Sequence, residues 1–265
     1  MCNATFRSAF GLVLGLVMLC PAPASAADGV RLIQQITGEG TSVRSEVLVE
    51  AQRIRTEVSD PAGRRQVIIF DAARDVLLIV DEASRRYTEL GRADAERMGV
   101  AMQGAMAMMQ EQLAKMPPEQ RKMMEEKMGG MLAALSGPAD TPVYKRVGTA
   151  TVGRWTCDRY EGYVGGNRAG EVCTVAPEVL GLKLEDFQVL TKMAGFVRAL
   201  LPQMADRFVG FGSADAGFDG LPVRAVSTAN GTTTTMELTE VRRDTFDDAL
   251  FVVPADYTRT TLPQF

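Results

Sequence analysis

The chain has 265 residues, a formal net charge of −4, no histidine, and 46% hydrophobic residues. This length suits one large domain. The lack of histidine excludes a hydrolase built on a Ser–His–Asp unit and a histidine-ligated catalytic zinc, and the mild acidity without a basic cluster argues against nucleic-acid binding.

Residues 1–26 have the pattern of a secretory signal. Arg7 supplies the positive start, Ala9 to Cys20 is an apolar stretch too short to span a bilayer, and Ala24-Ser25-Ala26 is a small-x-small cleavage site. A lipid anchor at Cys20 is disfavoured, because Leu19 precedes it where lipoprotein signals need a small residue. We therefore expect a mature chain over 27–265, periplasmic in a Gram-negative bacterium or secreted, without a transmembrane span.

Short apolar stretches alternate with turns between residues 30 and 90. A two-residue apolar period indicates strands with one covered face, and their close spacing predicts an antiparallel meander. The expected strands are 43–50, 53–59, 66–70, 76–80 and 85–90. Aspartates in this region, such as Asp71 and Asp81, fall at the turns, where their side chains cap the backbone. A metal or acid/base site is the weaker alternative for these acids.

The stretch 93–135 holds ten of the fifteen methionines. Steps of three and four residues from Met98 to Met116 place the apolar side chains on one face of a helix. Pro117-Pro118 ends that helix, because proline removes a donor and clashes in a helix interior. A similar pattern from Met124 to Leu135 predicts a second helix. We expect a helical hairpin inserted between two β segments.

Three interpretations of these methionines are open. Methionines at helical spacing usually pack in a core, here against a sheet. Flexible thioethers also form adaptable apolar surfaces that repack around a lipid-like or peptide ligand. Thioethers are ligands for Cu(I) as well, although no histidine or free thiol supports such a site. The first two interpretations are compatible, because a lid over a half-open sheet is core when it is empty.

Cys157 and Cys173 remain after the signal, and an even pair in an exported protein indicates a disulfide. The strands expected around them are 143–152, 155–164 and 169–176. The midpoint of the two cysteines is residue 165, at a glycine turn, so we expect them directly opposite each other on paired strands. A redox function is the weaker alternative, because the spacing is not C-x-x-C.

The remainder of the chain contains a further helix and closing strands. A helix is expected over 184–201, with an apolar face formed by Phe187, Leu190, Ala194, Val197 and Leu201. Asn230-Gly231, between the stretches 221–229 and 232–242, supplies the two left-handed residues of a type I′ hairpin turn. Leu250 to Val253 is expected to form the last strand.

Three segments together resemble an uncharacterised exported bacterial family of unknown function. They are Gly153 to Tyr160, Gly220 to Arg224 with the following Asn-Gly hairpin, and Phe251 to Tyr257. That family is similar in turn to the periplasmic lipoprotein carriers of the LolA/LolB type. The resemblance implies a half-open antiparallel β-barrel, with helices over its concave face and an apolar cavity that in the carriers receives acyl chains. The Met-rich insertion and the disulfide hairpin depart from those carriers.

The predicted fold is α+β, with a curved antiparallel sheet (a half-open β-barrel) whose concave face is covered by the hairpin 93–135 and the helix 184–201. The predicted function is a non-enzymatic exported binding or carrier protein for a hydrophobic, lipid-like ligand, without a cofactor. The candidate ligand contacts share an apolar placement on a helix or strand: Met102, Met106, Met109, Trp155, Met193 and Phe196. The alternatives are a Met-rich Cu(I)-handling protein and a structural envelope domain that docks a protein partner.

Overall fold

The computed structural model describes residues 26–38, 40–59, 63, 65–117, 119–120, 142–201, 217–229 and 232–261. The strands are β1 (Ala26–Gly38), β2 (Thr41–Glu50), β3 (Arg53–Ser59), β4 (Arg65–Asp71), β5 (Val76–Asp81), β6 (Arg86–Gly91), β7 (Val143–Val152), β8 (Trp155–Val164), β9 (Asn167–Val175), β10 (Leu221–Ala229), β11 (Thr232–Asp247) and β12 (Thr258–Thr260). The helices are α1 (Arg92–Lys115), η1 (Pro177–Leu180), α3 (Leu184–Leu200) and η4 (Asp248–Phe251). Residues 1–25 of the predicted signal and the second predicted helix of the Met-rich hairpin lie outside the described residues.

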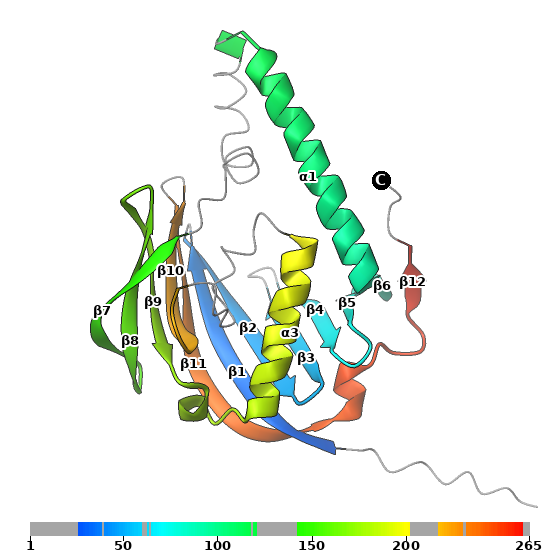
Figure 1. The fold of residues 1–265 in the computed structure, drawn as a ribbon. Helices are drawn as coiled ribbons and strands as arrows, with labels where there is room; N and C mark the ends of the chain where they lie inside the picture. The colour runs from blue at the N-terminus through cyan, green and yellow to red at the C-terminus, as the bar shows by residue number, and fades with distance from the viewer. Residues whose placement is uncertain are drawn as a thin grey trace, which may run out of the picture.

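The described strands form one sheet in the order β12-β6-β5-β4-β3-β2-β1-β11-β10-β9-β8-β7. It is open rather than closed, with β12 and β7 at its two edges, and it curves around α3 (Figure 1). Neighbouring strands are antiparallel except β12, which runs parallel to β6. The predicted meander is confirmed by the pairing from β2 to β6. It is extended by β1, a strand that was not predicted.

Each face of the sheet has its own apolar cluster. We call the face that packs against α3 the inner face and the opposite one the outer face. Buried side chains of the inner face, such as Leu32 and Val47, form one cluster with Val189, Leu190 and Phe196 of α3. Since successive strand residues alternate sides, Arg31 and Glu46 point to the outer face. The predicted helical cover of the concave face is confirmed for α3.

The outer face is partly covered by the C-terminal segment. Asp247 accepts a hydrogen bond from the Ala249 N–H at 2.9 Å and starts η4, which places Phe251 against Phe246 with ring centroids 6.0 Å apart. The predicted last strand at Leu250 to Val253 is therefore wrong. Its apolar pattern reflects one buried anchor, Phe251, and the last strand is β12.

Helix α1 agrees with the prediction. Asp94 accepts a hydrogen bond from the Gly91 N–H at 3.1 Å at the start of the helix, and Pro117 follows its end. The apolar positions on its half-buried face are Met98, Met102, Met106, Met109, Leu113 and Met116. We call this row the Met stripe.

The buried face of α3 differs from the predicted one. Its buried residues are Asp186, Val189, Leu190 and Phe196. The predicted apolar face was therefore rotated, and of its members only Leu190 is fully buried. The reason is that Asp186 lies on the buried face, where it accepts hydrogen bonds from the Lys183 N–H at 2.9 Å and from Arg243 at 3.3 Å. A carboxylate satisfied in this way can be buried.

Cys157 and Cys173 form the predicted disulfide, with Cα atoms 5.4 Å apart. The predicted register is wrong, because Cys173 lies opposite Arg159 rather than Cys157. The turn leaves Val164 opposite Asn167, and a bulge between Gly162 and Tyr163 adds one residue on β9. Together these shift the pairing by two residues, so the disulfide runs diagonally between side chains of the same face.

Candidate ligand-binding face

Three of the candidate ligand contacts lie together in the inner cluster. Trp155 and Phe196 are buried there, and the half-buried Met193 packs against the cluster. Phe196 is fully buried, with its ring edge against Phe70 at a centroid distance of 5.7 Å. Arg154 lies over the Trp155 ring, 5.0 Å from its centroid. These aromatic side chains are therefore part of the apolar cluster between the sheet and α3.

The other three candidates, Met102, Met106 and Met109, lie on the Met stripe of α1 and outside that cluster. The member of the stripe that packs against the cluster is Met98. The sequence analysis placed Met98 on the same helical face but did not include it among the candidate ligand contacts. The stripe thus runs without interruption from the inner core outward along α1.

Helix α1 is held to the rest of the fold at its first residue, Arg92. The guanidinium pairs with both carboxylate oxygens of Asp75, at 2.9 and 3.0 Å, and donates to the Gly195 carbonyl of α3 at 2.9 Å. It also lies over the Phe196 ring, 5.0 Å from the centroid. One side chain therefore connects the β4–β5 turn, α1 and α3. Sequence reasoning missed it, because these partners are far apart in the chain.

Beyond this attachment, α1 projects past the end of α3 (Figure 1). Its 24 residues correspond to about 36 Å of helix. Met108, off the stripe, is 65% exposed, whereas the stripe itself is half-buried. No helix in the described ranges is both long and apolar enough to cross a membrane.

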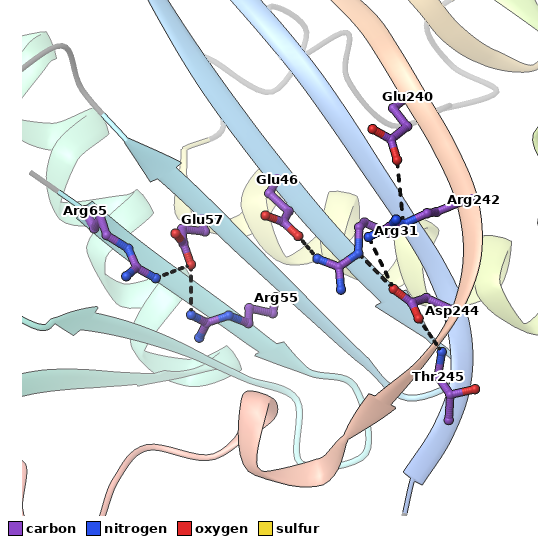
Figure 2. A network of polar contacts seen from close by, with 9 residues as sticks. All are labelled: Arg31, Glu46, Arg55, Glu57, Arg65, Glu240, Arg242, Asp244 and Thr245. Carbon is purple, nitrogen blue, oxygen red and sulfur yellow. Dashed lines mark hydrogen bonds and ion pairs between the residues drawn. The ribbon is translucent and has the colours of Figure 1, made fainter. Parts of the chain in front are cut away.

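Beside its apolar cluster, the outer face carries a network of charges. Figure 2 shows Arg31 of β1 between Glu46 of β2 and Asp244 of β11, with the Asp244 carboxylate 3.0 Å from Arg31 Nε. On β3, Glu57 accepts from Arg55 at 3.1 Å and from Arg65 at 2.7 Å. A pocket of about 260 Å³ lies here; its walls are Arg31, Glu46, Leu48, Arg55, Glu57, Arg65 and Leu250.

Two carboxylates of this outer network, Glu57 and Asp244, have a lowered pKa. Burial raises the pKa of Glu57, but the hydrogen bonds and charges of Arg65 and Arg55 outweigh it and lower the pKa. The hydrogen bond from Arg31 lowers the pKa of Asp244. The contacts with Arg31, Arg55 and Arg65 therefore stabilise the charged forms of Glu57 and Asp244 on the outer face.

A second pocket, of about 430 Å³, lies beside β8 and β9. Cross-strand neighbours Thr149, Asp158 and Thr174 contribute to its walls, together with the η1 region and Asp219. Asp158 is paired with Arg146 at 2.5 Å.

The aspartates expected to cap turns do so. Asp71 accepts hydrogen bonds from the Ala73 and Arg74 N–H groups, and Asp81 accepts them from the Ala83 and Ser84 N–H groups.

The geometry defines a class of protein: an open, curved antiparallel sheet with one helix packed on its inner face and a second, Met-lined helix projecting from that face. The chain belongs to the family described as a domain of unknown function, DUF4412, which matches residues 92–257. This confirms the predicted membership of a family of unknown function. No curated protein matches the sequence.

Several solved structures are similar in outline. An uncharacterised conserved protein from Thermus thermophilus is 9% identical, with a TM-score of 0.45 over 88% of this chain and 89% of that one. The matched chain of the Pseudomonas aeruginosa MucA/MucB complex is 10% identical, with a TM-score of 0.35 over 86% of this chain and 54% of that one. Mycobacterium tuberculosis lipoprotein LppX is 9% identical, with a TM-score of 0.30 over 82% of this chain and 86% of that one. At such low identities and TM-scores, the ligands and partners of those proteins are not transferred to this chain.

Proposed function

We propose that the protein is an exported, non-enzymatic binding or carrier protein for a hydrophobic, lipid-like ligand, held between the inner face of the sheet and the helices α1 and α3. The observation that carries this proposal is the continuous Met stripe, which starts in the core at Met98 and extends along a helix anchored at its base by Arg92. Unbranched thioethers adapt to ligands of varied shape at little cost.

The aromatic side chains of the inner cluster complement the stripe. Trp155 and Phe196 are packed with their rings fixed by Arg154, Arg92 and Phe70. In this proposal the packed aromatic side chains stay fixed and α1 adapts to the ligand. The volume of the site then changes when α1 moves, while the sheet keeps its shape. In this proposal Met102, Met106 and Met109 contact the ligand directly, whereas Trp155 and Phe196 support the base of the site.

The experiment compares two aspartate variants of α1 for binding of the fluorescent apolar probe N-phenyl-1-naphthylamine. Met106→Asp places a charge on the stripe, whereas Met108→Asp places the same charge at an exposed position of the same helix. We expect Met106→Asp to weaken probe binding by roughly tenfold or more, because an unpaired carboxylate resists transfer to an apolar site. Met108→Asp should bind as the unmodified protein does.

Circular dichroism and the melting temperature of both variants establish that they fold. Equal probe binding by the two folded variants would contradict the placement of the ligand on α1. Native mass spectrometry of gently purified protein gives the second readout, and a lipid-sized mass released by organic solvent is expected. A copper mass that survives desalting, and is lost on replacing Met102, Met106 and Met109 with leucine, would favour the Cu(I) alternative instead.

A further inference from the structure

A group of charged side chains lies on the inner face at one end of the sheet. We call it the rim cluster; its members are Lys145 of β7, Arg159, Glu161 and Tyr163 of β8, and Arg168 and Glu171 of β9. Arg159 and Glu161 share the strand alternation of Cys157, which belongs to the inner cluster. Glu171 lies opposite Glu161 and two residues from Cys173. The rim cluster therefore continues the inner face beyond the disulfide.

Lys145 is turned onto this face by a bulge in β7. The register places Lys145 opposite Glu161, with a shift between Arg146 and Gly148. Its Nζ lies 5.8 Å from the centroid of the Tyr163 ring. The next residue, Arg146, lies opposite Tyr160 and pairs with Asp158 on the outer face. Two adjacent cations of one strand thus point to opposite faces.

The charges of the rim cluster do not cancel. Arg159 contacts Glu161 at 2.9 Å and Glu171 at 3.0 Å, and Arg168 contacts the same two carboxylates at 3.4 and 2.6 Å. The Tyr163 hydroxyl donates to Glu161 at 2.6 Å. Lys145 has no ion-pair partner among the described residues. Three cations against two carboxylates leave one positive charge in a protein whose net charge is −4.

Exposure differs between the anions and the cations of the rim cluster. The side chains of Glu161 and Glu171 are 17% and 19% exposed, whereas those of Arg159 and Arg168 are 36% and 51% exposed. Lys145 is exposed as well. A molecule that approaches this surface therefore meets ammonium and guanidinium groups before it meets carboxylates. Guanidinium groups match the geometry of carboxylate and phosphate oxygens.

The rim cluster lies where an amphiphile in the proposed site would expose its polar end. The turn between β8 and β9 is at the end of the sheet toward which α1 projects (Figure 1). We propose that the ligand is an anionic amphiphile whose phosphate or carboxylate headgroup binds Lys145, Arg159 and Arg168, while its apolar tail follows the Met stripe. This inference rests on the proposed function and specifies its ligand class.

The test measures displacement of N-phenyl-1-naphthylamine by amphiphiles that share a dodecyl chain. Dodecyl phosphate and dodecanoate carry an anionic headgroup, dodecylglycerol is neutral, and inorganic phosphate has no tail. Each is titrated against the unmodified protein, Lys145→Gln and Arg146→Gln. The two variants lose one exposed charge each from adjacent residues, so Arg146→Gln is the matched control for the opposite face.

We expect the anionic amphiphiles to bind the unmodified protein more tightly than dodecylglycerol. Lys145→Gln should weaken the binding of the anionic amphiphiles by roughly fivefold, which is the order that a partly exposed ion pair contributes. The same variant should leave dodecylglycerol unchanged, and Arg146→Gln should affect none of the ligands. High salt should reduce only the anionic advantage, because exposed charges are screened.

The outcomes separate the inference from the proposed function. Tight binding of dodecylglycerol, with no anionic preference or no difference between the two variants, would overturn the headgroup inference while leaving the proposed function intact. Binding of inorganic phosphate as tight as that of dodecyl phosphate would show that the tail contributes nothing, and would also overturn it. Failure of all amphiphiles and of the probe would refute both.

Discussion

Replacing Arg92 with alanine tests whether one side chain secures α1. The variant loses a two-point ion pair with Asp75, a hydrogen bond to the Gly195 carbonyl and the contact with the Phe196 ring. The paired side chains are 34% and 44% exposed, which limits the ion pair to about 1 kcal/mol. The hydrogen bond contributes about 1 kcal/mol and the cation–π contact about 0.5 to 1. The sum is about 2 to 3 kcal/mol.

For a domain of this size, that loss corresponds to a fall in melting temperature of roughly 5 to 10 °C. Differential scanning calorimetry of the protein at neutral pH measures it. Arg74→Ala is the matched control, because within the described residues the Arg74 side chain forms one ion pair, with Glu89 at 3.3 Å, and is 54% exposed. If Arg92→Ala lowers the melting temperature no more than Arg74→Ala does, α1 is not held through Arg92.

Three further predictions concern stability. Reduction of the disulfide, or the paired Cys157→Ser and Cys173→Ser change, should destabilise the fold by roughly 3 kcal/mol in urea unfolding, and an unchanged midpoint would contradict this. Phe251→Ala should cost about 3 to 4 kcal/mol, whereas Val252→Ala, at a 58% exposed position, should cost well under 1; equal costs would refute the placement of η4. Glu57 has a pKa below its ordinary value of 4.5, so its contribution is present above that pH and lost as the pH falls through the lowered value. Glu57→Gln should therefore flatten the acid side of the stability profile, and an unchanged profile would count against the Arg55 and Arg65 contacts.

Features specified by local sequence could be predicted. Strands β10 and β11 pair with Ala229 opposite Thr232, which is the register that the Asn-Gly signal predicted. The end of α1 follows from Pro117, as predicted, because proline removes a donor and clashes in a helix interior. These signals act over a few residues, so tertiary packing seldom overrides them.

Features that depend on long-range partners could not be predicted. Leu250 to Val253 has the composition of a strand, but Phe251 has a partner in Phe246 that no local pattern reveals. On α3, the apolar periodicity suggested one buried face, and the contact of Asp186 with Arg243 of β11 selected another. Arg92 joins residues from three elements for the same reason.

The bulge in β7 shows how a single irregularity changes the chemistry of a face. Counting alternate residues from Ala150, which lies opposite Cys157, would place Tyr144 and Arg146 on the inner face. The bulge at Val147 reverses that assignment, so that Tyr144 packs on Phe218 while Lys145 joins the rim cluster. Gly148 follows with a φ of +148°, in the region that favours glycine. The bulge therefore decides which cation joins the rim cluster: it is Lys145, whereas residue alternation alone would have chosen Arg146.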